Sequence, residues 1–158
     1  MLKMADALAR HHIPLAMNQC EYSVLRRHPE THGLIRACRD RGITFQSYAS
    51  LAQGRLTGKY SEGYEPSPSY RFSSDPIAEI ERAVAVLREI AEEKRIAIAA
   101  VALNYNLSKG VVPIVGIRNP DQARQNMQAL GWRLSQDEIR RIEDVSLEGR
   151  TSILWQQA

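Results

Sequence analysis

The chain has 158 residues, of which 44% are hydrophobic and 25% are charged, and its formal net charge is +3. This is ordinary globular usage, which excludes a chain that is disordered throughout and predicts a single domain over residues 1–158. The sequence has neither the dense basic runs of nucleic-acid-binding proteins nor an apolar stretch near the ~20 residues of a membrane span. We therefore expect no nucleic-acid partner and no membrane partner.

The N-terminal segment, residues 1–12, predicts a short helix with apolar residues on one face, and it lacks the apolar core of a signal peptide. A chain that opens within a helical pattern is expected to be part of a longer protein. The two cysteines, Cys20 and Cys38, are too few and too far apart for a metal site. We expect two buried free thiols, which are typical of a reducing compartment and indicate a cytoplasmic location.

Two strands and a helix are predicted next. Residues 13–20 (IPLAMNQC) form a short apolar strand, and helical spacing follows over residues 29–41, with Gly42 just past the helix end. Residues 43–48 (ITFQSY) predict the second strand. A loop rich in Gly, Pro and Ser then extends over residues 49–74, and loops of such length usually indicate function or mobility.

A pair of helices and a third strand follow this loop. Asp75 and Pro76 predict the start of a long helix, with the aspartate as its cap and the proline in its first turn. The second helix is expected over residues 98–108. Residues 111–115 (VVPIV) are apolar on both faces, as the buried strands of parallel sheets are.

Two helices complete the pattern. Asn119 is expected to cap a helix that reaches Leu130, and Ser135 with Glu138 forms a capping box for the last helix. This alternation of strands and helices predicts an α/β fold, in which a parallel sheet has helices outside. The sequence contains neither GxGxxG nor GxxxxGK[ST], so it has neither of the common glycine-rich nucleotide motifs.

Polar residues follow each predicted strand, at the carboxyl ends where α/β barrels carry their functional residues. The segments are residues 18–25 (NQCEYSVL), 48–60 (YASLAQGRLTGKY) and 112–126 (VPIVGIRNPDQARQN), with the tail at residues 131–143 (GWRLSQDEIRRIE). In this order and spacing they resemble the cofactor segments of the aldo-keto reductases. The resemblance covers nearly the whole chain. It implies a partial (β/α)8 TIM barrel, with three parallel strands and outer helices.

The resemblance also implies a cofactor, NADP(H), and the residues that hold it. Gln19 matches the glutamine that binds the nicotinamide carboxamide, and Tyr48 matches the aromatic that stacks on the nicotinamide ring. The loop around the pyrophosphate corresponds to Ala49, Ser50, Leu51, Ala52, Gln53, Gly54 and Lys59, with Arg71 further along. The adenosine and its 2′-phosphate correspond to Gly116, Arg118, Gln122, Gln125 and Asn126.

The chain departs from the family pattern at two places. Ala49 and Ser50 stand where the family usually has Ser-Pro, and this change predicts a looser hold on the pyrophosphate. Gln125 stands where a glutamate is common, and this change is expected to alter how tightly the adenosine ribose is bound.

The resemblance places the catalytic residues outside this chain. The acid tyrosine, its lysine and aspartate partners and the substrate-orienting histidine belong to the N-terminal half of the family pattern. The resemblance implies that the chain begins in the helix before the sixth strand of the barrel. We therefore expect no catalytic residue here, a small carbonyl substrate for the full-length form, and self-association of the chain through unpaired strand edges.

Several alternatives stay open. The chain is a truncated or cropped oxidoreductase, a non-catalytic nucleotide-binding or interaction module like the potassium-channel β subunits, or a fragment without function. The histidines are expected to be exposed and without partners, and no metal site is predicted: His11, His12, His28 and His32.

Overall fold

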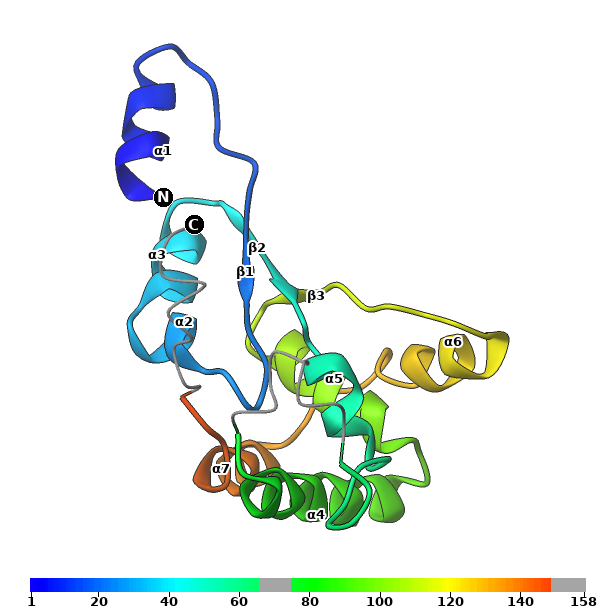
Figure 1. The fold of residues 1–158 in the computed structure, drawn as a ribbon. Helices are drawn as coiled ribbons and strands as arrows, with labels where there is room; N and C mark the ends of the chain where they lie inside the picture. Colours follow the sequence, from blue (N-terminus) through cyan, green and yellow to red (C-terminus); the bar gives the residue numbers. More distant parts are fainter. Residues whose placement is uncertain (66–74, 149–158) are drawn as a thin grey trace.

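The computed structural model of the chain describes residues 1–65 and 75–148. Its sheet has the order β1-β2-β3, with β1 at Met17–Glu21, β2 at Thr44–Tyr48 and β3 at Val112–Pro113. Both pairings are parallel, and Gln46 of the central strand lies beside Gln19 on one side and Val112 on the other. The predicted parallel sheet of three adjacent strands is therefore confirmed (Figure 1).

The two edge strands are shorter than the sequence predicts. Residues 13–16 precede β1, although the Ala16 carbonyl still accepts a bond from the Thr44 amide at 3.0 Å. In β3 only two residues pair, because Pro113 has no amide hydrogen to donate to the ladder. The Ile114 amide resumes the contact with a 2.8 Å bond to the Ser47 carbonyl.

The helix predicted over residues 29–41 is in fact two helices, α2 at His28–Thr31 and α3 at Leu34–Asp40. Gly33 separates them at φ 78°, a left-handed conformation that glycine adopts without steric cost and that interrupts a right-handed helix. Gly42 lies just past the end of α3, as predicted.

The loop after β2 is more ordered than the sequence suggests. It contains a short 3-10 helix, η1, at Ala52–Thr57. The long helix α4 covers Ile77–Lys94 and begins one residue later than predicted, with Pro76 rather than Asp75 at the capping position. Helix α5 occupies Ile98–Ser108, the predicted range.

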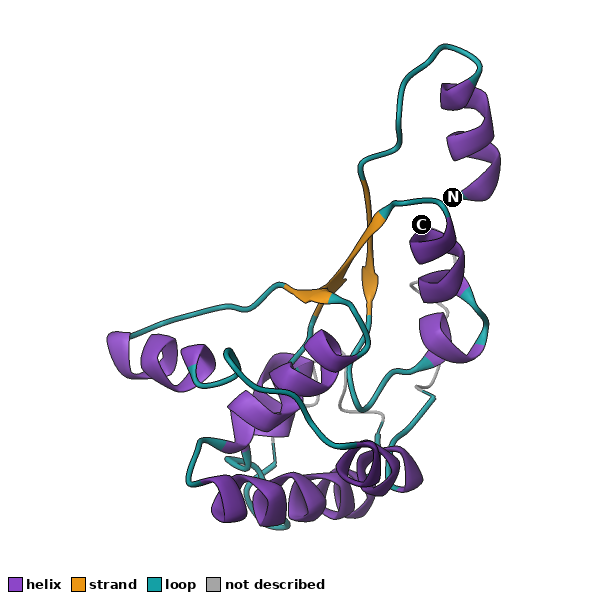
Figure 2. Cartoon of the chain, turned by 180° about the vertical axis from the view of Figure 1, so that it is seen from behind, coloured by secondary structure: helices purple, strands orange, loops and turns teal. Residues whose placement is uncertain are grey.

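The C-terminal helices begin where their capping residues predict. The Asn119 side chain accepts a 2.9 Å hydrogen bond from the Gln122 amide at the start of α6, which covers Pro120–Met127 and ends before Leu130. Ser135 and Glu138 form both bonds of the predicted capping box at the start of α7, Gln136–Asp144. At the other end of the chain, α1 (Leu2–Ala9) has no buried residue and stands away from the sheet in Figures 1 and 2.

The two faces of the sheet have opposite environments. The covered face carries Phe45 and Ser47, with Tyr22 just after β1; all three are buried, and the Tyr22 and Phe45 rings meet edge to face at 6.3 Å. Helices α3, α4, α5 and α7 contribute most of the rest of this core, together with η1 and loop residues such as Val24, Leu25 and Leu134. Cys38 is buried in it, as expected, but Cys20 is only partly buried. Neither cysteine forms a disulfide.

The other face, here called the open face, carries mostly exposed or half-buried side chains. Strand alternation and register place eight residues on it: Met17, Gln19, Glu21, Thr44, Gln46, Tyr48, Val112 and Ile114. Of these eight, Glu21 alone is buried, and its carboxylate pairs with Arg26 at 3.1 Å. Among the described residues, no helix combines the length and apolar character required to cross a membrane.

A charged cluster joins the helices on the covered side, and we call it the Glu30 cluster. It consists of Tyr22, Arg27, Glu30, Tyr105, Lys109 and Glu143. The Glu30 carboxylate accepts hydrogen bonds from Tyr22 at 2.9 Å and Tyr105 at 3.2 Å, and it pairs with Lys109 at 2.6 Å. Burial opposes ionisation of Glu30, but the bonds from Arg27, Lys109 and Tyr22 outweigh it and lower the pKa of the carboxyl.

Candidate functional site

A cleft of about 720 Å³ opens at the carboxyl ends of β2 and β3. The loop after β2, the loop after β3 and helix α6 supply its walls. Its lining residues are Ala49, Ser50, Leu51, Gln53, Gly54, Thr57, Lys59, Tyr60, Ala99, Ile114, Val115, Gly116, Ile117, Arg118, Gln122, Gln125 and Asn126. This volume lies within the range of roughly 300–1,000 Å³ usual for small-molecule sites.

The wall formed by the loop after β2 has an unusual backbone. Ala49, Ala52 and Gln53 all have positive φ values, between 47° and 54°, and Gly54 follows at 91°. Only glycine adopts such a φ without strain, so Gly54 permits the tight turn within η1. This turn places Gly54 against Lys59, whose side-chain carbon Cε would lie 3.6 Å from a Cβ added at the glycine.

Ser50 anchors the same loop to both neighbouring strands. Its hydroxyl is buried and donates to the carbonyls of Ser47 at 3.0 Å and Ile114 at 3.3 Å, while its oxygen lies 2.9 Å from the Ser47 hydroxyl. Ser47 in turn donates to the Asn106 side chain on α5 at 3.0 Å. The serine that stands in the expected place of a proline therefore fixes the loop to the sheet, while the looser hold on the pyrophosphate stays a prediction.

The opposite wall is the loop after β3 and the start of α6. The Arg118 amide donates to the side-chain oxygen of Gln122 at 2.8 Å, which ties the loop to the first turn of the helix. The Gln122 side chain keeps its NH₂ group as a donor. Arg118 is exposed, and Gln125 and Asn126 line the cleft one turn further along α6.

The charges of the cleft favour an anion. Lys59 and Arg118 line it from opposite walls, and its described lining contains no carboxylate. The Lys59 ammonium lies 4.5 Å from the centroid of the Tyr60 ring, a cation–π contact that positions the charge. Helix α6 also begins at this cleft, and the N-terminus of a helix carries a partial positive charge.

The structure brings together most of the residues singled out from the sequence. Eleven of them line the cleft: Ala49, Ser50, Leu51, Gln53, Gly54, Lys59, Gly116, Arg118, Gln122, Gln125 and Asn126. Ala52 is instead fully buried in the core, and Arg71 lies outside the described residues.

Gln19 and Tyr48 lie outside the lining of the cleft, on the open face of the sheet. The Gln19 side chain donates to the Gln46 side chain at 3.4 Å, and Tyr48 lies two residues further along the same face. Burial raises the pKa of the half-buried Tyr48 hydroxyl. Of the three residues expected around a single cleft, Arg118 lines the cleft, whereas Gln19 and Tyr48 lie together on the open face of the sheet.

Six lining residues were given no role from the sequence, although all but Ala99 lie in the singled-out segments 48–60 and 112–126: Thr57, Tyr60, Ala99, Ile114, Val115 and Ile117. Two signals were present in the sequence. Ile114 and Val115 end a predicted strand, and Thr57 lies between the two glycines of the loop after β2. Ala99 gave no signal, because it belongs to a helix that only the tertiary structure brings to the cleft.

Comparison with known proteins gives this cleft a context. Residues 2–147 match the model of the aldo/keto reductase family. The chain is 32% identical to the chloroplastic pyridoxal reductase of Arabidopsis thaliana, over 98% of this chain and 42% of the relative. It is 30% identical to an L-glyceraldehyde 3-phosphate reductase of Escherichia coli O157:H7, over 98% of this chain and 48% of the relative.

Solved structures agree on the fold. A glycerol dehydrogenase from Gluconobacter oxydans superposes with a TM-score of 0.78 at 22% identity, covering 94% of this chain and 48% of that one. The chain thus spans less than half the length of these relatives, and its three parallel strands with their helices correspond to part of their barrel. With the family model matched over almost all of its length, the chain belongs to the aldo/keto reductase family.

Proposed function

We propose that this chain holds NADP(H) for a reductase that interconverts a carbonyl compound and its alcohol. The observation that carries the proposal is the cleft at the strand ends, lined by Lys59 and Arg118 and by no carboxylate among the described residues. Phosphate groups are the anions that such a cleft suits, because charge-assisted hydrogen bonds to them are stronger than neutral ones.

The two walls suit different parts of the cofactor. The loop from Ala49 to Gly54, fixed by Ser50 and followed by Lys59, is assigned to the pyrophosphate. Arg118 is assigned to the 2′-phosphate, since its planar guanidinium matches a phosphate bidentately. The remaining polar side chains that line the second wall are assigned to the adenosine: Gln122, Gln125 and Asn126.

The open face is assigned to the nicotinamide. When bound, the cofactor supplies or accepts the hydride. The Gln19 amide has both a donor and an acceptor, which suits a carboxamide, although in this structure its donor is engaged by Gln46. The ring of Tyr48, two residues along the same face from Gln46, offers a surface for stacking.

The substrate class follows from the relatives. Pyridoxal and L-glyceraldehyde 3-phosphate both carry an aldehyde, so a small aldehyde or ketone is proposed here. No residue of this chain matches the family's proton-donating tyrosine, and its residues are assigned to cofactor binding alone. We place the chain in the cytoplasm, because Cys20 and Cys38 are not joined in a disulfide, which is typical of proteins in a reducing compartment.

Titration of the purified chain with NADPH, followed by calorimetry or fluorescence, tests the proposal. We expect saturable binding that Lys59→Ala and Arg118→Ala each weaken. Arg36→Ala is the matched control, because Arg36 is 84% exposed on α3 and does not line the cleft. No binding, or equal binding by all variants, would remove the cleft from this role.

A turnover assay separates the reductase from a non-catalytic nucleotide-binding module of the same fold. We expect the chain by itself to bind NADPH without oxidising it in the presence of aldehydes, because a missing general acid typically costs about 10²–10⁴-fold. Multiple turnovers abolished by Tyr48→Phe would instead assign the proton transfer to a tyrosine of this chain.

A further inference from the structure

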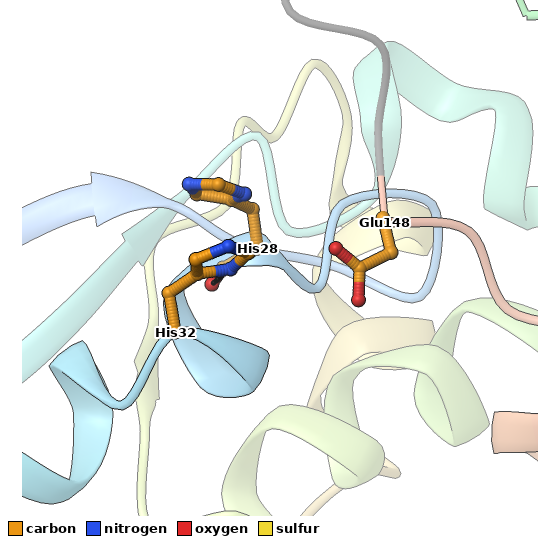
Figure 3. A group of neighbouring side chains, drawn as sticks. All are labelled: His28, His32 and Glu148. Atoms are coloured by element: carbon orange, nitrogen blue, oxygen red, sulfur yellow. Dashed lines mark hydrogen bonds between the residues drawn. The ribbon is translucent and has the colours of Figure 1, made fainter.

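Three metal-ligating side chains meet on the surface, on elements that do not line the strand-end cleft. His28, His32 and Glu148 each offer one ligand atom, and these three atoms all lie within 4.8 Å of one another (Figure 3). All three residues are exposed. Helix α2, which carries the histidines, and helix α6 of the cleft lie on opposite sides of the sheet in Figures 1 and 2.

The spacing of the two histidines is the one used by helical metal sites. His28 begins α2 and His32 follows its last residue, four positions later, so their side chains share one side of the turn. Their rings stack with centroids 3.8 Å apart, which contradicts the expectation that these histidines lack partners. The His32 Nδ1 also lies 3.1 Å from the Thr31 hydroxyl and 3.3 Å from the His28 carbonyl.

These contacts orient the ring of His32. Ligating histidines usually bond through one ring nitrogen to a carbonyl or similar group, which leaves the other nitrogen for the metal. The surroundings of His32 thus resemble the supporting shell of a metal ligand.

Backbone hydrogen bonds hold Glu148 beside the histidines. The amide of His28 donates to the Glu148 carbonyl at 3.2 Å, and the amide of Arg27 donates to the Leu147 carbonyl at 3.0 Å. Leu147 in turn donates to the Val24 carbonyl at 3.0 Å. The segment after α7 is therefore paired with the segment before α2, and the three ligands start from fixed backbone positions although they are far apart in the sequence.

We propose that His28, His32 and Glu148 form a binding site for Zn²⁺, with water completing the coordination. Two imidazoles and one carboxylate are a ligand set that Zn²⁺ accepts in four-coordinate sites. Metal–ligand distances of about 2.1 Å place neighbouring ligand atoms of a tetrahedral site ~3.4 Å apart. The present separations, up to 4.8 Å, are within reach of small rotations of these exposed side chains. The bound ion would link the segment after α7 to α2.

Calorimetric titration of the untagged, chelator-treated chain with ZnCl₂ tests the site. We expect one equivalent to bind. His28→Ala or His32→Ala should weaken binding by more than the about 10–100-fold that loss of a supporting contact usually causes. Glu148→Gln should weaken it less, because two imidazoles remain. His11→Ala is the matched control, since His11 is an exposed histidine outside the group.

Two further measurements make the result independent of folding defects and of thiols. Thermal melting without metal should be the same for all variants, while a hundredfold excess of Zn²⁺ over Kd should raise the Tm of the unmutated chain by roughly 5–10 °C. Cys20→Ser should leave binding unchanged, and Co²⁺ in the site should give d–d bands without thiolate charge transfer. The proposal is overturned by absence of binding, by undiminished binding in both histidine variants, or by loss of binding in Cys20→Ser.

Discussion

The covered and open faces of the sheet are built from the same three strands, yet they differ in what surrounds them. Phe45 on the covered face is 3% exposed, whereas Met17, Val112 and Ile114 on the open face are 51%, 46% and 41% exposed. The covered face also leads into the Glu30 cluster, in which each charge has an opposite partner. The open face leads into the cleft, where Lys59 and Arg118 have no carboxylate among the described lining residues.

Because of this difference, we expect the covered face to determine the stability of the fold, and the open face and the cleft to determine association and ligand binding. Side chains on the covered face are buried in the folded chain and become exposed to water when it unfolds. Their truncation should therefore lower the free energy of unfolding. The exposed side chains of the open face and the cleft, such as Val112 and Arg118, keep much of their contact with water in the folded chain. Their removal should alter association and ligand binding while leaving the free energy of unfolding nearly unchanged.

The largest expected effect is on stability, at the covered face. Phe45→Ala should lower the free energy of unfolding by about 3–5 kcal/mol, because it leaves a cavity against Tyr22 and the surrounding helices. Val112→Ala on the open face is the matched control and should cost about 0.5 kcal/mol or less. Urea denaturation followed by circular dichroism measures both. Similar costs for the two variants would show that the faces do not differ as described.

The next effect is on cofactor choice, in the cleft. Arg118→Ala should weaken NADPH binding about ten- to a hundredfold, since a hydrogen bond to a charged group contributes roughly 1.5–3 kcal/mol. NADH, which lacks the 2′-phosphate, serves as the internal control and should lose little. Equal losses for the two cofactors, measured by calorimetry, would assign Arg118 to a different part of the ligand. The Tm without cofactor should not change.

A third expected effect is that the stability contributed by Glu30, on the covered side, depends on pH. The lowered pKa of Glu30 means that its ionised form stabilises the folded chain above the unfolded-state value of 4.5, and that this contribution is lost as pH falls through the lowered value. Glu30→Gln should therefore cost about 1–3 kcal/mol near pH 7 and progressively less below about pH 4.5. Urea melts from pH 7 to pH 3 measure the difference between the two proteins.

Glu89→Gln provides the control for this pH dependence. Glu89 pairs with Arg141 at 2.7 Å but is 61% exposed, so its loss should cost at most about 1 kcal/mol. A cost for Glu30→Gln that stays constant down to pH 3 would contradict the stabilising role assigned to the ionised carboxylate.

The smallest effect on stability, and the clearest on association, is expected at the open face. Exposed apolar residues on the edge strands favour self-association, and lysine on an edge strand opposes it. Met17→Lys combined with Val112→Lys should shift the chain toward the monomer in light scattering, with a stability change of about 0.5 kcal/mol or less. A monomeric unmutated chain, or association that the double variant does not reduce, would contradict this assignment.

Local signals in the sequence determined much of the fold. The capping residues Asn119, Ser135 and Glu138 act within one turn of their helices, so α6 and α7 begin where the sequence predicts. The predicted bounds of α5 also hold, because the Lys109-Gly110 pair that ends this helix is likewise a local signal. The parallel direction of the three strands also followed from alternation, because parallel strands need a crossover connection, usually a helix.

Tertiary structure decided what depends on residues far apart in the chain. Ser50 fixes its loop only because Ser47 and Ile114 lie on neighbouring strands. Strand register places Gln19 and Tyr48 on the open face, outside the lining of the cleft. A shift of one residue in this register would move both side chains to the covered face.

The site at His28 and His32 is the clearest case of a feature that depends on residues far apart in the chain. The sequence contains His28 and His32 four residues apart, but their third partner, Glu148, follows the last helix of the fold. Only hydrogen bonds between the segments before α2 and after α7 bring that carboxylate within reach. The sequence by itself determined the family and most cleft residues because these act through local motifs, whereas contacts between distant segments arise only when the chain packs.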